Sequence, residues 1–322
     1  MLLLLCFTSG WAHSRIPPQV KFKPILANEL EKLAYVNAIA QDKDGFIWIG
    51  AIQGLARYDG YTLKTYTYDE NDPTSISHNW IKQLTLDSED NLWAVSQFGV
   101  CRYQALIDKF DCIEKTGEGV NSKVRAAIFS MLEDTQGNFW VSTSEGLKIL
   151  DPASRTFNPV PQHLHEILSP SASSEANVVH QMVQHPSGDL WFGLQGNGVV
   201  RYTPSTQAIK HFRSQDKEPN SLPANKIREL LIDSRGDLWV GSLGGGIARF
   251  NSNTNEFIRF KHSNNEKADT VWDIIEDESG IFWIADGTGV HLYDPETSAF
   301  REYNYVEGAQ DGPGNFVGRD LF

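Results

Sequence analysis

One short pattern, Asp-x-x-Gly-x-x-Trp, recurs along this chain of 322 residues and constrains its fold more than any other feature. The first clear copy runs from Asp42 to Trp48, and two later copies each depart from it at one position. A repeat of this length, in a sequence with little helical periodicity, is typical of stacked units that bury their faces against one another. The copies end, at intervals of 44 to 51 residues, at Trp48, Trp93, Trp140, Trp191, Trp239 and Trp283.

Each repeat has the pattern of four short antiparallel strands. In the first repeat, residues 36–41 form a mostly apolar run, and residues 46–51 form a second strand that carries Trp48. Strands at residues 55–59 and 63–68 follow after turns rich in Gly and Asp. Four such strands per repeat predict an all-β fold, a β-propeller of four-stranded antiparallel blades with six complete repeats visible.

The repeated Trp and Asp are predicted to be scaffold. A large ring from each second strand can fill the wedge between neighbouring blades, where its burial contributes about 2–3 kcal/mol. The Asp is expected to accept hydrogen bonds from backbone N–H groups of its own turn. Asp90 stands where Gly is expected in the second copy, and His185 stands where Asp is expected in the fourth. We expect turns to tolerate both changes.

The two ends of the chain predict a signal peptide and a seventh blade. Residues 1–14 form a short apolar run that ends in Ala12-x-Ser14, the small-x-small pattern of a signal-peptide cleavage site. We therefore expect export to the periplasm, with residues 15–322 forming the propeller. Residues 20–26 resemble a fourth strand, and residues 314–322 resemble an opening strand. The ring is thus predicted to be seven-bladed, with its last blade truncated in this sequence.

Two cysteines lie on successive strands of the second repeat. Antiparallel pairing of these strands places Cys101 opposite Cys112. An oxidising compartment would permit a disulfide between them. Free cysteines are also commonly buried as small hydrophobic residues. The second interpretation is favoured, and the disulfide stays open as the alternative.

Residues 159–176 form an insertion between the third and fourth repeats. The segment contains His163, His165 and Glu166, which are residue types that bind metals, but their spacing alone is weak evidence for a site. Surface loops tolerate insertions well. We therefore predict a solvated loop without a metal.

The whole repeat resembles the two-component regulator propeller family. The closest copies run from Ile232 to Gly241 and from Gln41 to Gly50, and the resemblance covers about residues 20 to 322. It implies a periplasmic, non-enzymatic sensor that forms the input part of a membrane receptor. In that family a further β-domain, a transmembrane helix and a histidine kinase or diguanylate cyclase follow the propeller, and several members sense carbohydrates. The implied partners are a small polar ligand such as an oligosaccharide, the downstream domains and a second protomer.

Candidate binding residues are expected where the repeat leaves a position variable. One such position lies in the first strand, eleven residues before each Trp, and another lies in the loop between the second and third strands. Both are expected near the mouth of the central channel, where amides and charged groups can pair with hydroxyls and a Trp can stack on a sugar ring. The predicted rim consists of Trp80, Lys82, Gln97, Arg125, Glu145, His180, Gln195, Asn197, Arg228, Trp272 and Asp286.

Charge and motifs argue against several other functions. A net charge of −13 and a pI near 5.1 argue against nucleic-acid binding, which needs basic surfaces. The glycines at residues 193–198 and 244–246 lead into strands, whereas a dinucleotide-binding loop opens a helix. No Gly-x-Ser-x-Gly nucleophile turn occurs. We expect no cofactor and no catalytic residue, and we keep two alternatives open: a secreted propeller lyase or hydrolase, and a protein-interaction scaffold.

Overall fold

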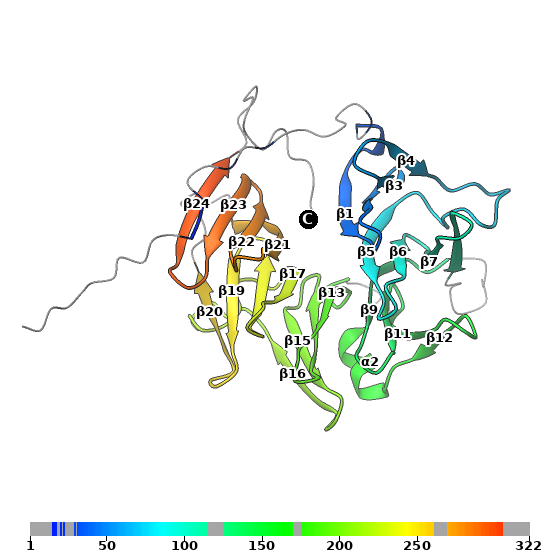
Figure 1. The fold of residues 1–322 in the computed structure, drawn as a ribbon. Helices are drawn as coiled ribbons and strands as arrows, with labels where there is room; N and C mark the ends of the chain where they lie inside the picture. Colours follow the sequence, from blue (N-terminus) through cyan, green and yellow to red (C-terminus); the bar gives the residue numbers. More distant parts are fainter. Residues whose placement is uncertain are drawn as a thin grey trace, which may run out of the picture.

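The computed structural model describes residues 15–17, 20, 22, 29, 31–114, 125–169, 175–260 and 269–304, and these form six four-stranded antiparallel sheets. The strands of each sheet lie in chain order, so every blade is a simple meander. Figure 1 shows the blades following one another around a common axis, from blade one in blue to blade six in orange, with the first strand of each blade innermost. The predicted all-β propeller is confirmed.

The same four-strand unit recurs with closely similar bounds in all six blades. Blades one to three contain β1 (Val36–Gln41), β2 (Ile47–Ala51), β3 (Gly54–Tyr58), β4 (Leu63–Tyr66), β5 (Ile81–Leu86), β6 (Leu92–Ser96), β7 (Gly99–Gln104), β8 (Lys109–Glu114), β9 (Ile128–Glu133), β10 (Phe139–Thr143), β11 (Gly146–Asp151) and β12 (Thr156–Pro159). Blades four to six contain β13 (Val179–Gln184), β14 (Leu190–Leu194), β15 (Val199–Thr203), β16 (Ala208–Phe212), β17 (Ile227–Ile232), β18 (Leu238–Ser242), β19 (Gly246–Asn251), β20 (Glu256–Phe260), β21 (Val271–Glu276), β22 (Phe282–Asp286), β23 (Gly289–Asp294) and β24 (Ala299–Asn304).

The repeated Asp connects the turn to the Trp. In blade one, Oδ1 of Asp42 accepts hydrogen bonds from the backbone N–H groups of Asp44 and Phe46, both at 3.0 Å. Its other oxygen, Oδ2, accepts a hydrogen bond from Nε1 of Trp48 at 2.7 Å. The same Trp-to-Asp bond, at 2.8 to 3.0 Å, occurs in four further blades at Asp87, Asp134, Asp233 and Asp277. The predicted capping role of the Asp is confirmed, and the bond to the indole adds a second role.

The repeated Trp fills the wedge between adjacent blades. Trp48 is fully buried, and its ring centroid lies 4.6 Å from that of Tyr103 in blade two. Trp191 meets Phe250 of blade five at 4.7 Å, and Trp239 meets Phe282 of blade six at 4.9 Å. Each of these three rings therefore contributes to the core of its own blade and of the next one, which confirms the predicted scaffold role.

Blade four lacks the Asp of the motif, and its Trp loses the hydrogen bond. His185 occupies the Asp position. Its Nδ1 forms a hydrogen bond with Ser187 Oγ at 2.8 Å, and its Nε2 lies 2.8 Å from the carbonyl oxygen of Gly236. Trp191 is only 2% exposed, and its Nε1 has no hydrogen-bond partner in the described part of the chain. An unpaired buried donor of this kind costs about 1–3 kcal/mol.

Residues 159–176 differ from the predicted solvated loop. They contain the helix α2 (Gln162–Leu168), in which Leu164 and Leu168 are fully buried in one cluster with Trp140 and Tyr202. Leu164 and Leu168 lie four residues apart, which places them on one helix face. The helix packs against β11 and fills part of the wedge between blades three and four. The prediction of a loop was wrong because this helical spacing is short and lies within a polar segment.

Two of the three metal-binding residue types of the insertion, His165 and Glu166, make contacts within the helix and its end. Ser169 Oγ lies 3.0 Å from His165 Nδ1, and Glu166 accepts a hydrogen bond from Gln162 at 3.0 Å. Among the described residues, no cluster of three His, Cys, Asp or Glu side chains has the arrangement of a metal site.

The predicted signal peptide and seventh blade fall mostly outside the described residues. Residues 1–14 and 314–322 lie outside them, as do all of residues 20–26 except Val20 and Phe22. Phe22 packs edge-on against Tyr303 at 5.6 Å, and Val20 N–H donates to the hydroxyl of Tyr303 at 3.1 Å. Val20 and Ile16 cover the face of blade six that carries Trp283. In the earlier blades, the face that carries the motif Trp packs against the following blade. No helix of the described ranges is long and apolar enough to cross a membrane.

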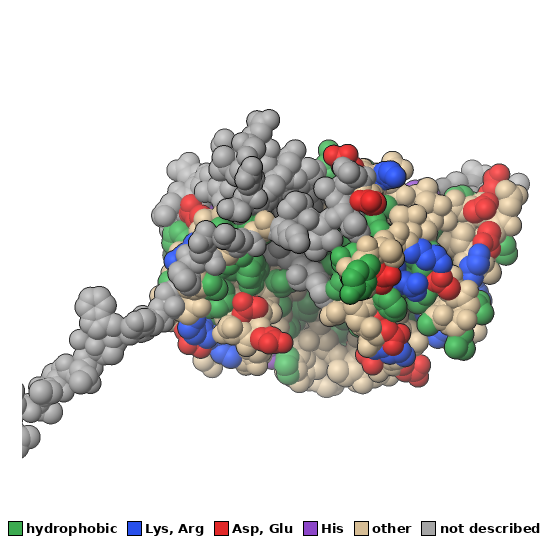
Figure 2. Space-filling model, turned by 45° about the horizontal axis from the view of Figure 1, so that its top comes forward, with side chains coloured by type: hydrophobic (Ala, Val, Ile, Leu, Met, Phe, Trp, Pro, Cys, Tyr) green, Lys and Arg blue, Asp and Glu red, His purple; other side chains and the backbone are tan. Residues whose placement is uncertain are grey.

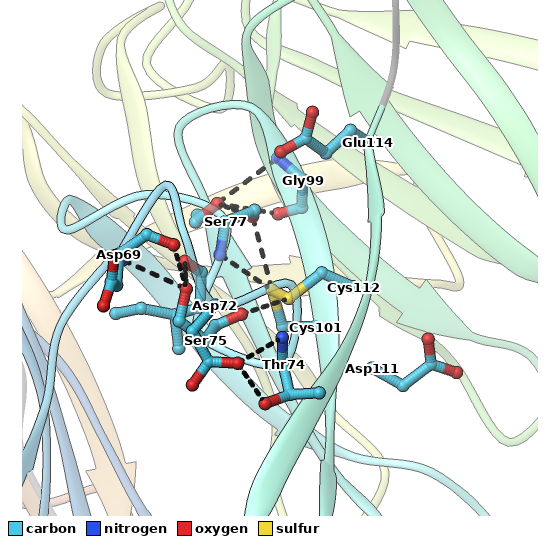
Figure 3. The surroundings of a disulfide bond; sticks show 12 residues. Asp69, Asp72, Thr74, Ser75, Ser77, Gly99, Cys101, Asp111, Cys112 and Glu114 are labelled. Atoms are coloured by element: carbon cyan, nitrogen blue, oxygen red, sulfur yellow. Dashed lines mark hydrogen bonds between the residues drawn. A yellow bond between two sulfur atoms is a disulfide. The ribbon is translucent and has the colours of Figure 1, made fainter.

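Cys101 and Cys112 form a disulfide in the structure, between β7 and β8 (Figure 3). The two residues are direct partners in the antiparallel register, as predicted. Ser77 donates its backbone N–H to Cys101 Sγ at 3.4 Å, and Cys112 Sγ lies 3.4 Å from the carbonyl oxygen of Ser75. The favoured prediction of two free thiols is therefore wrong, and the disulfide alternative is the one that the structure contains. The bond joins the outer strand of blade two to its neighbour and contacts the connection from blade one.

We expect His185→Asp to raise the free energy of unfolding by about 1 kcal/mol, because the new carboxylate would accept the Trp191 Nε1–H bond and outweigh the lost contact with Gly236. Urea denaturation measures the effect, and Asp233→His is the matched reverse change, expected to destabilise by about 1–3 kcal/mol. Trp191→Phe should lower the free energy of unfolding more in the His185→Asp background than in the wild type, because only that background has the hydrogen bond to lose. Equal costs in the two backgrounds would contradict the assignment.

Reduction of the Cys101–Cys112 bond, which spans 11 residues of sequence, should lower the free energy of unfolding by about 2–3 kcal/mol. The measurement is urea unfolding with and without reductant, with thiol titration to verify reduction. The double variant Cys101→Ala/Cys112→Ala is the control, and its unfolding should not respond to the reductant. An unchanged midpoint in fully reduced wild-type protein would show that the bond does not stabilise the fold.

Candidate functional site

Every first strand carries a β-bulge at its variable position. In blade one the pairing of β1 with β2 shifts between Val36 and Ala38, so Asn37 is the extra residue. The same shift recurs in the other five blades. A bulge re-aims its side chain and removes the regular packing constraint on it. This explains why the position varies, and the bulge residues are Asn37, Lys82, Phe129, His180, Arg228 and Trp272.

Polar bulge side chains reach the innermost strand of the next blade. Asn37 Nδ2 donates to the carbonyl oxygen of Ile81 at 3.0 Å, and Lys82 Nζ donates to that of Ile128 at 2.6 Å. Arg228 of blade five contacts Nε2 of His180 in blade four and also lies over the ring of Trp272 in blade six, 5.3 Å from its centroid. The bulges thus form a set of contacts that cross the blade interfaces around the channel.

Lys82 lies in a partly apolar environment at the interface of blades two and three. Its ammonium group is 4.3 Å from the ring centroid of Phe129 and 5.3 Å from that of Trp80. Burial lowers the pKa of Lys82 to about 8, and the charge of Glu175 opposes this shift. The side chain therefore titrates near physiological pH, and its cation is held mainly by aromatic faces and a carbonyl oxygen.

One position after the bulges, three neighbouring blades carry Gln181, Glu229 and Asp273. Gln181 Nε2 donates to both carboxyl oxygens of Glu229, at 3.0 and 3.1 Å. Asp273 is 5% exposed and accepts the backbone N–H of Ile274 at 2.8 Å. Burial, and then the charge of Asp273, raise the pKa of Glu229 well above its usual value. The electrostatics of Glu229 and Asp273, on neighbouring blades, are therefore coupled.

A cavity of about 470 Å³ lies between blades four and five, beside these residues. Three predicted rim residues line it: His180, Gln195 and Arg228. Glu175 and Ala176 come from the end of the insertion, and the carbonyl oxygen of Ala176 accepts the N–H of Gly196 at 3.1 Å. The insertion therefore supplies one wall of a pocket that the regular repeat would leave open.

Lys226 also lines this cavity and was not among the predicted residues. It precedes its first strand by one residue and occupies the same register as Trp80, which was predicted from that position. The repeat alignment could therefore have predicted Lys226 as a rim residue. Glu175 carried no such signal, because no other repeat has an equivalent insertion.

The other predicted rim residues lie at separate places. Arg125 pairs with Glu114 at 3.3 Å, and the Oε1 atom of the half-buried Gln97 has no partner within the described ranges. Glu145 is half-buried, and its backbone N–H donates to Thr143 at 3.1 Å. The Asn197 side chain donates to Asn177 Oδ1 at 2.6 Å, and neither residue lines the cavity.

Asp286 is buried within its own loop. Its carboxylate accepts hydrogen bonds from the backbone N–H and the hydroxyl of Thr288, at 2.8 and 2.7 Å, and lies 3.0 Å from His291 Nε2. The structure thus gathers only part of the predicted rim into one pocket, and Asp286 has an internal role in the loop between β22 and β23.

The surface of the described part carries mixed charges. On the face drawn in Figure 2, Asp and Glu side chains are interspersed with Lys and Arg. A second cavity of about 400 Å³ lies between the motif turns of blades one and two and the β7–β8 hairpin, where Leu106 and Ile107 are exposed. It is lined by scaffold turns, whereas the first cavity is lined by variable positions.

Three segments of the chain, residues 32–53, 125–145 and 221–244, match the model of the two component regulator propeller family. They hold the first two strands and the Asp turn of blades one, three and five. These three segments are similar to two component regulator propeller repeats. The predicted resemblance is confirmed, and no curated protein sequence matches the chain.

Solved structures share this propeller fold. The extracellular domain of the hybrid two component system BT3049 from B. thetaiotaomicron is 21% identical with a TM-score of 0.69, over 88% of this chain and 37% of that one. The extracellular domain of the one component system BT4673 from the same organism is 21% identical with a TM-score of 0.63, over 83% and 35%. A virginiamycin B lyase from Staphylococcus aureus is 15% identical with a TM-score of 0.61, over 87% of both chains. The chain thus spans little more than a third of the first two structures, and these identities show the fold alone.

We expect stability to fall with rising pH through Glu229. Its raised pKa means that the folded state binds a proton that the unfolded state has released. The contribution is therefore complete below the unfolded pKa of about 4.3 and is lost as the pH rises toward the folded pKa, at up to about 1.4 kcal/mol per pH unit. Glu229→Gln keeps the polar contact with Gln181 and should flatten this slope. Parallel stability–pH curves for the wild type and the variant, measured by urea unfolding, would contradict the assignment.

Proposed function

We propose that this chain is the extracytoplasmic, non-enzymatic input part of a membrane signal-transduction receptor and that it binds a small polar ligand, such as an oligosaccharide, between blades four and five. The cavity beside Arg228 carries this proposal. It unites three variable rim positions from two blades, and its size lies within the usual range of ligand pockets.

The side chains of the cavity suit a ligand rich in hydroxyl groups. Gln195 is exposed and offers both a donor and an acceptor, and His180 and Arg228 add directional polar groups. Trp272 lies beneath the Arg228 guanidinium at the same channel mouth. An aromatic face beside polar groups supports stacking of a sugar ring, whose C–H face is apolar while its hydroxyls need partners.

The relatives support the receptor role. Two of the similar structures are described as extracellular domains of two-component or one-component systems, and the matched family is named for two-component regulators. Because those structures are much longer than this chain, the downstream β-domain, the membrane anchor and the kinase or cyclase output belong to the proposal. Export through residues 1–14, homodimerisation and the role of Cys101–Cys112 in an oxidising compartment belong to it as well.

The bulge contacts supply a route for a signal. A ligand that binds Arg228 contacts a side chain already joined to His180 of blade four and Trp272 of blade six. It can shift an equilibrium only through different affinities for two arrangements of these blades. Closing or opening the blade interfaces around the channel is such a change, and the domain that follows the propeller would read it.

We expect Arg228→Ala and Trp272→Ala each to weaken saccharide binding about tenfold or more, because each removes a group worth about 1.4 kcal/mol or more at a pocket. Titration calorimetry measures affinity, and thermal melting of each variant verifies that it still folds. Arg213→Ala, at an exposed arginine of the blade-four connection, is the matched control. Unaltered affinity in both variants would remove the site. Chromatography of the same oligosaccharides after incubation should show no shorter products, and their appearance would favour the secreted-enzyme alternative.

A further inference from the structure

The cavity between blades four and five concentrates positive charge on an acidic chain. Lys226, Arg228 and His180 line it, with Glu175 as the carboxylate in its wall. The whole chain has a net charge of −13. A pocket lined by one lysine, one arginine and one carboxylate therefore stands out electrostatically from its surroundings, and low-dielectric walls strengthen its field.

Arg228 is held in a defined orientation. Its NH1 group contacts Nε2 of His180, and its guanidinium lies over Trp272 with 5.3 Å between the guanidinium carbon and the ring centroid. An arginine N–H donates, so His180 Nε2 accepts in this arrangement. A guanidinium fixed between an imidazole and an indole loses little side-chain entropy on binding, and its planar fork matches the two oxygens of a carboxylate or sulfate.

Lys226 adds a second cation on the same wall. Its side chain is exposed at the cavity and takes part in no ion pair with another described residue. The field of Glu175 reaches Lys82 of blade two and opposes the burial effect there. Glu175 is thus shared between the cavity and the neighbouring channel mouth, and the cavity keeps a net positive charge.

We propose that the ligand of this cavity is an anionic saccharide, whose carboxylate or sulfate oxygens bind Arg228 and Lys226 while its hydroxyls meet Gln195. His180 positions the guanidinium, and Glu175 weakens the binding of the anion. This inference rests on the proposed ligand-binding function and adds the charge of the ligand to it.

The first experiment compares binding of the wild-type protein to a panel of neutral, uronic-acid-containing and sulfated oligosaccharides of matched length, including galactan and polygalacturonate fragments. We expect binding of acidic members at least tenfold tighter than that of neutral ones, with affinity falling at high salt. Tighter binding of the uronic-acid-containing members, of the sulfated members or of both supports the proposal, and it identifies which anion the cavity binds. Equal binding of neutral and acidic members would overturn this inference and leave the saccharide function intact. No binding by any member would overturn both.

The second experiment uses charge variants with the tightest acidic ligand. Arg228→Gln and Lys226→Gln should each weaken it roughly 10- to 100-fold, because each removes a charge-assisted contact. Glu175→Gln should strengthen it several-fold and leave neutral oligosaccharides unaffected. Lys210→Gln, at an exposed lysine on the outer strand of blade four, is the matched control and should leave affinity unchanged.

Two variants of His180 test whether this residue positions Arg228, with the affinity for the acidic ligand as the measurement. His180→Gln keeps a polar acceptor for Arg228 and should retain most of the affinity, whereas His180→Ala should lose about tenfold. Equal effects of these two variants, or a Glu175→Gln variant that weakens acidic ligands, would overturn the assigned roles.

Discussion

The hydrogen bond from the indole Nε1 of the motif Trp to the carboxylate six residues before it, present in five of the six described blades, is the interaction on which the ring depends. One carboxylate oxygen closes the turn through two backbone N–H groups, and the other fixes the ring that enters the wedge. Turn geometry, strand pairing and blade-to-blade packing are therefore coupled within a few residues. Burial alone would place an aromatic ring in the wedge, but the bond also fixes its rotation, so that the next blade always meets the same shape.

The structure departs from this rule most in blade four, which also borders the cavity. Its Trp191 has no carboxylate partner, and its insertion builds part of the cavity wall. Ile227 lines the cavity and belongs to the same core cluster as Trp191, so the loosened ring and the candidate site share one interface. Elements that move in response to ligands are drawn from the less stable parts of a fold. The interface of blades four and five meets that condition, since it lacks one buried hydrogen bond that five equivalent positions have.

The repeat made most of the fold predictable, and its exceptions were the less predictable part. The Trp register located the strands of blade one to within two residues, and the varying column eleven residues before each Trp marked the bulges without showing why it varied. The second role of Asp42 needed coordinates, because nothing in a spacing of six residues shows that two side chains face each other across a turn. The helix α2 was missed because two buried leucines in a polar insertion give a weak periodic signal. The disulfide was left as an alternative because register brings two cysteines together without deciding their redox state.

Of the candidate rim, sequence could name the variable positions but not their grouping, since Glu175 joins His180 and Arg228 only through the path of the insertion.

The bulge contacts show how the proposed ligand binding and structural stability can share this channel. A bulge residue is released from the regular pairing of its own blade, yet in this ring it contacts the next blade, as Asn37, Lys82 and Arg228 do. A ligand group that draws Arg228 toward it therefore acts on His180 and Trp272, and so on two interfaces at once. The carboxyl groups of Glu229 and Asp273 lie one residue further along the same strands, where burial and the charge of Asp273 raise the pKa of Glu229 and so couple blades five and six electrostatically. A single charged group bound at the channel mouth would thus change the electrostatic balance of three adjacent blades while the Trp scaffold beneath them stays fixed.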